Sequence, residues 1–217
     1  MGSSPSRLKP LQRAVLAAFF EREGRFFLTG GGALAGFHLG HRETNDLDLF
    51  TTDDALEEGE AALGDAAAAL GASLERVRTA PDFRRRVVRR AGESVVVDLV
   101  RDRVPQVRPE KSVLDGVRVD PPEEIFANKL CTLLSRSEPR DLVDVRALEG
   151  LGLDLDAALA GASLKDGGLT PGQLAWVLSE ITIGDDARVP GNVGVPELRA
   201  YLANLIARLS KRAFPKT

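Results

Sequence analysis

The chain has 217 residues, of which 43% are hydrophobic, 28% charged and only 5% aromatic, and its formal net charge is −3. This length suits one domain, or one domain with a helical extension, and it allows a core without disulfide or metal support. The apolar content is too high and the net charge too small for an intrinsically disordered chain. The apolar runs are far shorter than the ~20 residues of a membrane-spanning helix, so we expect no membrane partner.

The cysteine and histidine contents limit the possible metal chemistry. The single cysteine, Cys131, excludes a disulfide framework and a multi-cysteine zinc site, and it indicates a cytoplasmic protein. His38 and His41 are the only histidines, and we do not interpret them as metal ligands because a helix end at Gly40 accounts for His41. Any metal ion must therefore be bound by carboxylates.

The first half of the chain has the pattern of alternating helices and strands. Helices are predicted where apolar residues recur every three or four positions, and strands where they alternate with polar ones. The predicted elements are a helix at 8–23, a strand at 26–28, a helix at 33–39, a strand at 47–50, a helix at 53–70 capped by Asp53 or Asp54, and strands at 73–78, 82–90, 94–100 and 117–119.

From Pro121 onward the pattern is helical. Helices are predicted to begin at Pro122 and Pro139, and further helices cover 154–159, 171–178 and 195–209. We therefore predict an α+β fold with a mixed sheet, divided into a core at 1–120 and a C-terminal helical region at 121–217. We expect the helical region to complete a groove that it shares with the core.

Three carboxylates are predicted to lie together in the first half. Asp46 and Asp48 alternate with leucines, so both project from one face of a strand, where they repel each other unless a cation lies between them. Asp98 interrupts the apolar strand at 94–100, where an unpaired charge is costly. Side by side, the three would form a two-metal site for Mg²⁺, with Mn²⁺ as the alternative.

A glycine run precedes these carboxylates. Gly30, Gly31 and Gly32 lie between a predicted strand and a predicted helix, where their backbone N–H groups can approach a triphosphate. Each feature has a simpler explanation, because glycine triplets usually form turns, D-x-D pairs occur by chance, and Asp98 could pair with a surface arginine. Their order along the chain is nevertheless specific and favours nucleotide chemistry.

Four motifs in sequence resemble those of the AbiEii/AbiGii toxin family, which includes the MenT toxins and belongs to the nucleotidyltransferase superfamily of DNA polymerase β. The motifs are Gly30-Gly-Gly-Ala-Leu-Ala35, Leu39-Gly-His-Arg-Glu-Thr-Asn-Asp-Leu-Asp-Leu-Phe50, Ile125-Phe-Ala-Asn-Lys-Leu130 and Arg140-Asp-Leu-Val-Asp144. The resemblance extends from Leu28 to Leu148. Two positions depart from the family pattern, since Gly32 replaces a common threonine and Thr44 replaces the usual serine.

The resemblance implies a polymerase β-like core and a role for each motif residue. Asp46, Asp48 and Asp98 would be metal ligands and catalytic residues, with Asp98 also a candidate base for the acceptor hydroxyl. Lys129 and Asp141 would be catalytic as well, with Asp141 orienting Lys129 or Arg140. The residues expected to bind the nucleotide are Gly30, Gly31, Gly32, Arg42, Thr44 and Lys129. For Asp144, helix capping and a functional role are both open.

Basic residues are dense at 84–90. This run is either a solvated strand edge or an RNA contact, and the residues we consider for RNA contact are Arg84, Arg86 and Arg89. Exposed aromatic partners for stacking are scarce, because Trp176 and Tyr201 are each the single residue of their type. Recognition of successive bases on aromatic platforms is therefore not expected.

The resemblance implies a metal-dependent nucleotidyltransferase that acts as the toxin of a toxin–antitoxin system. The expected reaction transfers a nucleotide, with a pyrimidine favoured, from an NTP to the 3′ end of tRNA, which blocks translation. The expected partners are the NTP, the tRNA acceptor end and a cognate antitoxin. Two alternatives remain open at this point: transfer to a small-molecule or protein hydroxyl, and a non-catalytic nucleotide-binding module.

Overall fold

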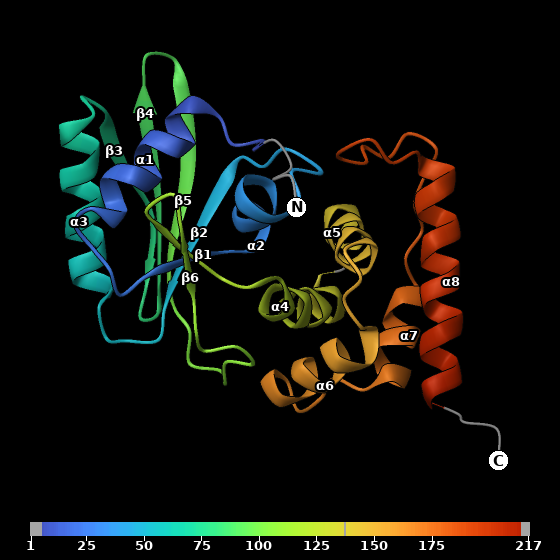
Figure 1. Ribbon diagram of the computed structural model, residues 1–217. Helices are drawn as coiled ribbons and strands as arrows, with labels where there is room; N and C mark the ends of the chain where they lie inside the picture. The colour runs from blue at the N-terminus through green and yellow to red at the C-terminus, as the bar shows by residue number, and fades with distance from the viewer. Residues whose placement is uncertain (1–5, 137, 214–217) are drawn as a thin grey trace. The chain divides into compact units, whose positions relative to one another are not determined.

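The computed structural model describes residues 6–136 and 138–213, and the chain divides into two units (Figure 1). The first unit comprises Met1–Val104 and Pro109–Pro121, and the second comprises Pro105–Arg108 and Pro122–Thr217. The predicted boundary at residue 120 differs from this division by one residue and by the four-residue segment that belongs to the second unit. Among the described residues, no helix has both the length and the apolar character needed to cross a membrane.

The first unit contains a seven-stranded sheet in the order β3-β4-β5-β2-β1-β7-β6 (Figure 1). The pairs β2–β5 and β1–β7 are parallel and the other neighbours are antiparallel, which confirms the predicted mixed sheet. The strands are β1 (Phe27–Thr29), β2 (Asp46–Thr51), β3 (Ser73–Ala80), β4 (Phe83–Arg90), β5 (Glu93–Arg101), β6 (Ser112–Leu114) and β7 (Val117–Val119). Sequence reasoning missed β6, which is only three residues long.

Alternating side chains give the sheet two different faces. Along β2, Leu47 and Leu49 are fully buried, whereas Asp46 and Asp48 are only partly buried. The buried face packs with helices α1 (Pro10–Phe20) and α3 (Leu56–Ala69), which also contact each other. Because side chains in a strand alternate, this core packing forces both aspartates onto the opposite face.

Two helix starts differ from the prediction. The helix after β1 begins at Gly30 as α2 (Gly30–Ala33) and continues as a π-helix, η1 (Leu34–His38), so the glycine run is itself helical. Helix α3 begins at Leu56, and its N-cap residue is Ala55 rather than the predicted Asp53 or Asp54. Asp54 instead forms an ion pair with Arg101.

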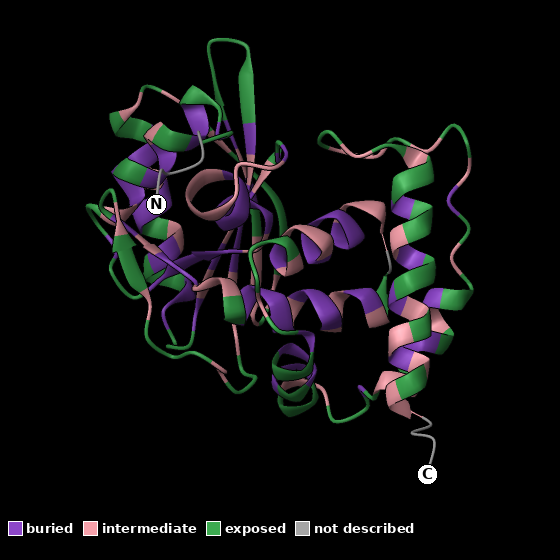
Figure 2. Cartoon of the chain, turned by 45° about the vertical axis from the view of Figure 1, so that its right-hand side comes forward, coloured by how far each residue is buried: buried purple, intermediate pink, exposed green. Residues whose placement is uncertain are grey.

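The second unit consists of helices, as predicted. They are α4 (Pro122–Ser135), α5 (Pro139–Gly150), α6 (Leu155–Lys165), α7 (Pro171–Ser179) and α8 (Val195–Ala213). Buried residues extend along most of α4 and α5, which form the core of this unit (Figure 2). Threonine and aspartate caps begin two of the helices, with Thr170 accepting from the backbone of α7 and Asp154 from that of α6.

Buried contacts explain why residues 105–108 belong to the helical unit. The backbone N–H of Arg108 donates to Glu124 Oε2 at 2.5 Å. Glu124 also forms an ion pair with Lys165, and both side chains are buried. Gly161 lies so close to Val107 that a Cβ there would meet Val107 Cγ2 at 2.9 Å. Residues 105–108 therefore pack with the second unit, although the sequence pattern placed them in the first domain, 1–120.

Candidate active site

At the end of β1, a sharp strand-to-helix turn places the backbone of Gly30 next to the Asp48 carboxylate. Gly30 has φ +59°, in the left-handed region that favours glycine. A Cβ at this position would lie 2.6 Å from Asp48 Oδ2, so the turn fits only when residue 30 has no side chain. The first turn of α2 is thereby held directly against the aspartate pair.

Replacing Gly30 with alanine is expected to destabilise the fold and displace the Asp48 carboxylate. The left-handed backbone alone costs an alanine about 1–2 kcal/mol. Gly64 provides a matched control, because nothing lies within 4 Å of a Cβ there and the residue is inside α3. Gly64→Ala should be neutral or stabilising by up to about 1 kcal/mol. Thermal unfolding of both variants measures the difference, and equal melting temperatures would contradict this account of the turn.

The three predicted carboxylates lie on neighbouring strands. Asp48 is paired in register with Asp98 across the parallel β2–β5 ladder. Asp98 is buried, and it receives two hydrogen bonds from Arg85 on β4, from Nε at 2.8 Å and from Nη2 at 2.6 Å. These hydrogen bonds raise the pKa of Arg85, and the charges of Asp46 and Asp48 add to the effect. Pairing with a surface arginine was the simpler explanation of Asp98, and the structure identifies that arginine as Arg85.

The donor set suits a hard divalent cation, and one of the three carboxylates, Asp98, is hydrogen-bonded to Arg85. Carboxylate oxygens are the ligands that Mg²⁺ prefers, together with water and substrate phosphates. In the part of the chain that the structure describes, no group of three or more histidine, cysteine or acidic side chains is arranged to hold a metal. Asp46 and Asp48 therefore fit a metal that is completed by a nucleotide, whereas Asp98 is engaged with Arg85.

The loop before β2 orients the first carboxylate. The Thr44 hydroxyl donates to Asp46 Oδ1 at 2.5 Å, and Thr44 is buried. Arg42 is also buried, and its guanidinium lies under the glycine turn, because a Cβ on Gly31 would meet Arg42 Nη2 at 2.8 Å and Thr44 Oγ1 at 3.3 Å. Thr44 thus orients the Asp46 carboxylate, and Arg42 packs against the backbone of Gly31.

Gly32 lies apart from this polar group. A Cβ at Gly32 would meet Leu28 Cδ1 at 3.1 Å and Leu47 Cδ2 at 3.5 Å, so the position faces the apolar core. A threonine side chain here would have to fit between leucines. The backbone oxygen of Asp46 lies 3.7 Å from the same Cβ position.

Two residues at the start of α1 that sequence reasoning missed, the N-cap residue Lys9 and Gln12, hold the loop in place. Gln12 is buried, and its side-chain amide donates to the Thr44 carbonyl at 3.1 Å. Lys9 Nζ donates to Asn45 Oδ1 at 2.9 Å, and the Lys9 backbone N–H donates to Gln12 Oε1 at 2.8 Å. Only the Lys9-x-x-Gln12 spacing at a helix start could have indicated these contacts from the sequence.

The second unit contains a buried ionic cluster built on α4 and α5. Lys129 Nζ lies 2.8 Å from Asp141 Oδ1 and 2.7 Å from Asp144 Oδ2. Both aspartates are fully buried, and the Lys129 side chain is only 7% exposed. Burial disfavours the charged ammonium, but the charges of Asp144 and Asp141 outweigh it and raise the pKa of Lys129. Lys129 therefore remains a cation throughout the physiological pH range.

Asp141 has a second cationic partner. Arg136 donates to it through Nε at 3.1 Å and Nη2 at 3.2 Å, a contact that sequence reasoning missed. Burial opposes ionisation of Asp141, but the charge of Lys129 and the hydrogen bonds from Arg136 outweigh it and lower its pKa. Arg140, which the sequence suggested as a partner of Asp141, forms an ion pair with Glu138. Asp144 binds Lys129 directly, so its role is more than helix capping.

Comparison with known proteins identifies the family of the chain. The family described as "Nucleotidyl transferase AbiEii toxin, Type IV TA system" matches residues 14–210. The chain belongs to the AbiEii nucleotidyltransferase toxin family. This membership confirms the resemblance drawn from the four motifs. It also establishes the chain as a nucleotidyltransferase toxin of a type IV toxin–antitoxin system, a class that acts with an antitoxin and uses an NTP.

Solved structures show the same fold. The nucleotidyltransferase toxin MenT4 from Mycobacterium tuberculosis aligns with a TM-score of 0.68 and 18% identity, over 92% of this chain and 82% of the MenT4 chain. JHP933 from Helicobacter pylori aligns with a TM-score of 0.60 and 21% identity, over 93% of this chain and 89% of the other. No curated protein sequence matches. At these identities the likeness establishes the nucleotidyltransferase fold.

The basic run of the toxin is divided between the two faces of β4. Arg86 is 1% exposed and Arg84 is 14% exposed, and both form ion pairs with Glu60 of α3. The burial of Arg86 contradicts the expectation that it contacts RNA, and Arg84 is only partly exposed. Arg89 is 56% exposed and pairs with Glu75, which is 54% exposed, so Arg89 is the most accessible of the three predicted residues. The odd-numbered arginines face the carboxylates, and the even-numbered ones face the helix.

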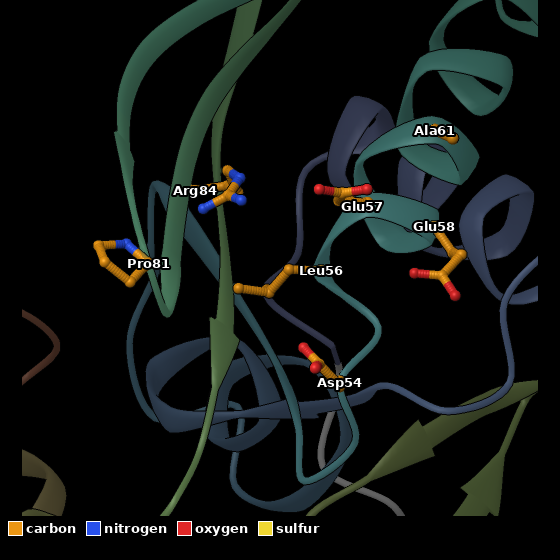
Figure 3. Close-up of a pocket in the computed structure, with 7 residues that line it drawn as sticks. All are labelled: Asp54, Leu56, Glu57, Glu58, Ala61, Pro81 and Arg84. Carbon is orange, nitrogen blue, oxygen red and sulfur yellow. The ribbon is translucent and has the colours of Figure 1, made fainter.

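A pocket of about 640 Å³ lies on the helix side, between the start of α3 and the β3–β4 turn (Figure 3). Its lining residues are Asp54, Leu56, Glu57, Glu58, Ala61, Pro81 and Arg84. Figure 3 shows Arg84 across the pocket from the acidic first turn of α3. Arg84 projects from the α3 side of β4, opposite the carboxylates, so this pocket is separate from the candidate active site.

Proposed function

We propose that the toxin transfers a nucleotide from an NTP to the 3′ end of tRNA and releases pyrophosphate, with Mg²⁺ bound by Asp46 and Asp48. The observation that carries the proposal is the contact between the left-handed Gly30 turn and the Asp48 carboxylate. It brings the N-terminal turn of α2 and two metal-binding carboxylates together, which is the combination that a metal–triphosphate needs. The metal ion would supply charge neutralisation and activation of the attacking hydroxyl.

The chain's own residues hold the nucleotide and the carboxylates in place. The backbone around Gly30 and Gly31 can approach the phosphates closely, because no side chain intervenes there. Thr44 fixes the orientation of Asp46 through its hydroxyl, and Arg42 lies against Gly31.

The proposal is tested by incubating the toxin with Mg²⁺, each of the four α-labelled NTPs in turn, and total tRNA. We expect label in tRNA, with a pyrimidine NTP as the preferred donor, and no label after chelation of the metal. Oxidation of the tRNA 3′-terminal diol with periodate before the reaction should abolish labelling, because it removes the acceptor hydroxyl. The labelled tRNA should then fail to accept its amino acid.

Two outcomes would overturn this assignment. Labelling of periodate-treated tRNA would place the transfer away from the 3′ end. Label in added small hydroxyl compounds or in protein, with none in tRNA, would support the alternative acceptor classes. Stability provides an independent control, since Mg²⁺ and an NTP together should raise the melting temperature of the toxin even without tRNA.

A further inference from the structure

A row of paired residues extends across the sheet from the carboxylates to its edge. Asp48 pairs with Asp98 across β2–β5, Asp98 with Arg85 across β5–β4, and Arg85 with Arg78 across β4–β3. Paired positions on neighbouring strands project from the same face. The strands lie about 4.8 Å apart, so Arg78 is about 10 Å along the row from Asp98. The row therefore continues the candidate active site toward the open edge of the sheet (Figure 1).

An aromatic ring supports the cationic end of this row. The guanidinium carbon of Arg78 lies 5.8 Å from the centroid of the Phe83 ring, and that of Arg85 lies 5.6 Å from it. Both arginines therefore share the ring, which confirms that they lie on one face of β3 and β4. A ring contact of this kind orients a guanidinium without neutralising its charge.

Four neighbouring arginines form ion pairs with carboxylates, and Arg78 differs from them. Arg76, Arg84 and Arg86 form ion pairs with Glu60, and Arg89 pairs with Glu75. Within residues 6–136 and 138–213, Arg78 has no carboxylate partner within ion-pair distance, and it is exposed. An exposed guanidinium that an aromatic ring orients, as in Arg78, suits a negatively charged ligand such as a phosphate.

We propose that Arg78, oriented by the Phe83 ring that it shares with Arg85, binds the phosphate backbone of the acceptor strand next to the carboxylate face. This inference rests on the proposed function and assigns the acceptor to a single-stranded polynucleotide end. Phosphates along a strand can engage cations beyond the reacting hydroxyl, whereas a small acceptor has no group that needs a contact about 10 Å away. Arginine guanidinium planes also stack on unpaired bases.

The test compares Arg78→Ala with Arg90→Ala. The second variant removes the same charge from the opposite face of the sheet, on β4. Arg90 is exposed, and it alternates with Arg89 on the strand that carries Arg85. Binding of a short single-stranded RNA oligonucleotide is measured by fluorescence anisotropy at several salt concentrations. We expect Arg78→Ala to weaken binding about fivefold and to reduce the slope of log K against log salt by about 0.7, the value for one phosphate contact. Arg90→Ala should match the wild type.

Transfer kinetics separate this inference from the proposed function. Arg78→Ala should raise the KM for tRNA and leave the KM for the NTP unchanged, while Arg78→Lys should recover part of the loss. Equal RNA affinity of Arg78→Ala and the wild type, or equal losses in the Arg78 and Arg90 variants, would overturn the inference. Arg78-dependent RNA binding by a protein that transfers nothing to tRNA would uphold this surface and overturn the proposed reaction instead.

Discussion

Replacing Asp48 with asparagine is expected to lower the rate of nucleotide transfer by about 10³-fold or more while leaving the fold intact. An asparagine side chain offers only one neutral oxygen, which is a poor ligand for Mg²⁺, and so the charge at the reacting phosphate is no longer balanced. The same change removes one of two neighbouring like charges, so it should not lower the melting temperature. The measurement is label transfer from the NTP to tRNA, together with thermal unfolding.

Asp65 provides a charge-matched control for the Asp48 variant. It lies exposed on α3, within the same unit but in a helix. Asp65→Asn should transfer label at the wild-type rate, and its melting temperature should rise with Mg²⁺ and NTP as that of the wild type does. The Asp48 variant should lose this ligand-induced rise. If it kept more than about a tenth of the wild-type transfer rate, Asp48 would not be the metal ligand that we propose.

The sequence was sufficient for the features that short-range patterns encode. Alternation of leucine and aspartate along β2 predicts correctly that Asp46 and Asp48 share the face opposite the core. The family motifs also selected Lys129 and Asp141, which the structure joins at 2.8 Å. Both predictions succeeded because strand periodicity and the spacing within a motif can be seen in a short stretch of sequence.

Features that depend on the pairing of distant strands could not be predicted. The contact between Arg85 and Asp98 requires the register of β4 against β5. Without that register, a basic run gives no sign of which arginines face the carboxylates and which face α3. The helix start at Gly30 was missed because a glycine triplet usually indicates a turn, whereas here a positive φ permits a helix without an intervening loop.

Replacing Lys129 with methionine is expected to destabilise the helical unit strongly. The change removes the ammonium that Asp141 and Asp144 share and leaves two buried carboxylates with one cation fewer. Breaking a buried ion pair by removing one partner costs about 3–5 kcal/mol. At about 2–4 °C per kcal/mol for a chain of this size, the melting temperature should fall by about 10 °C. Lys211→Met, on the exposed side of α8, should change stability by less than about 0.5 kcal/mol.

The pH dependence of the Lys129 variant should have the opposite sign to that of the wild type. In the wild type, the lowered pKa of Asp141 stabilises the fold above its unfolded-state pKa, and this stabilisation is lost as the pH falls through the folded-state value. The raised pKa of Lys129 stabilises the fold below its unfolded-state pKa, and that contribution is lost only at strongly alkaline pH. Without the ammonium, burial favours protonated carboxyl groups, so the variant should become more stable as the pH falls from 7 toward 5.

A double variant distinguishes the loss of the ion pair from a general packing defect. In Lys129→Met with Asp144→Asn, one of the two buried carboxylates is neutral, and Asp141 keeps the two hydrogen bonds from Arg136. Because the uncompensated charge is gone, the double variant should recover much of the stability lost in the single variant, and its stability should vary little between pH 5 and 7. If the single and double variants melted at the same temperature throughout this range, the methionine would act by disturbing the packing. The ionic cluster would then contribute little to the stability of the toxin.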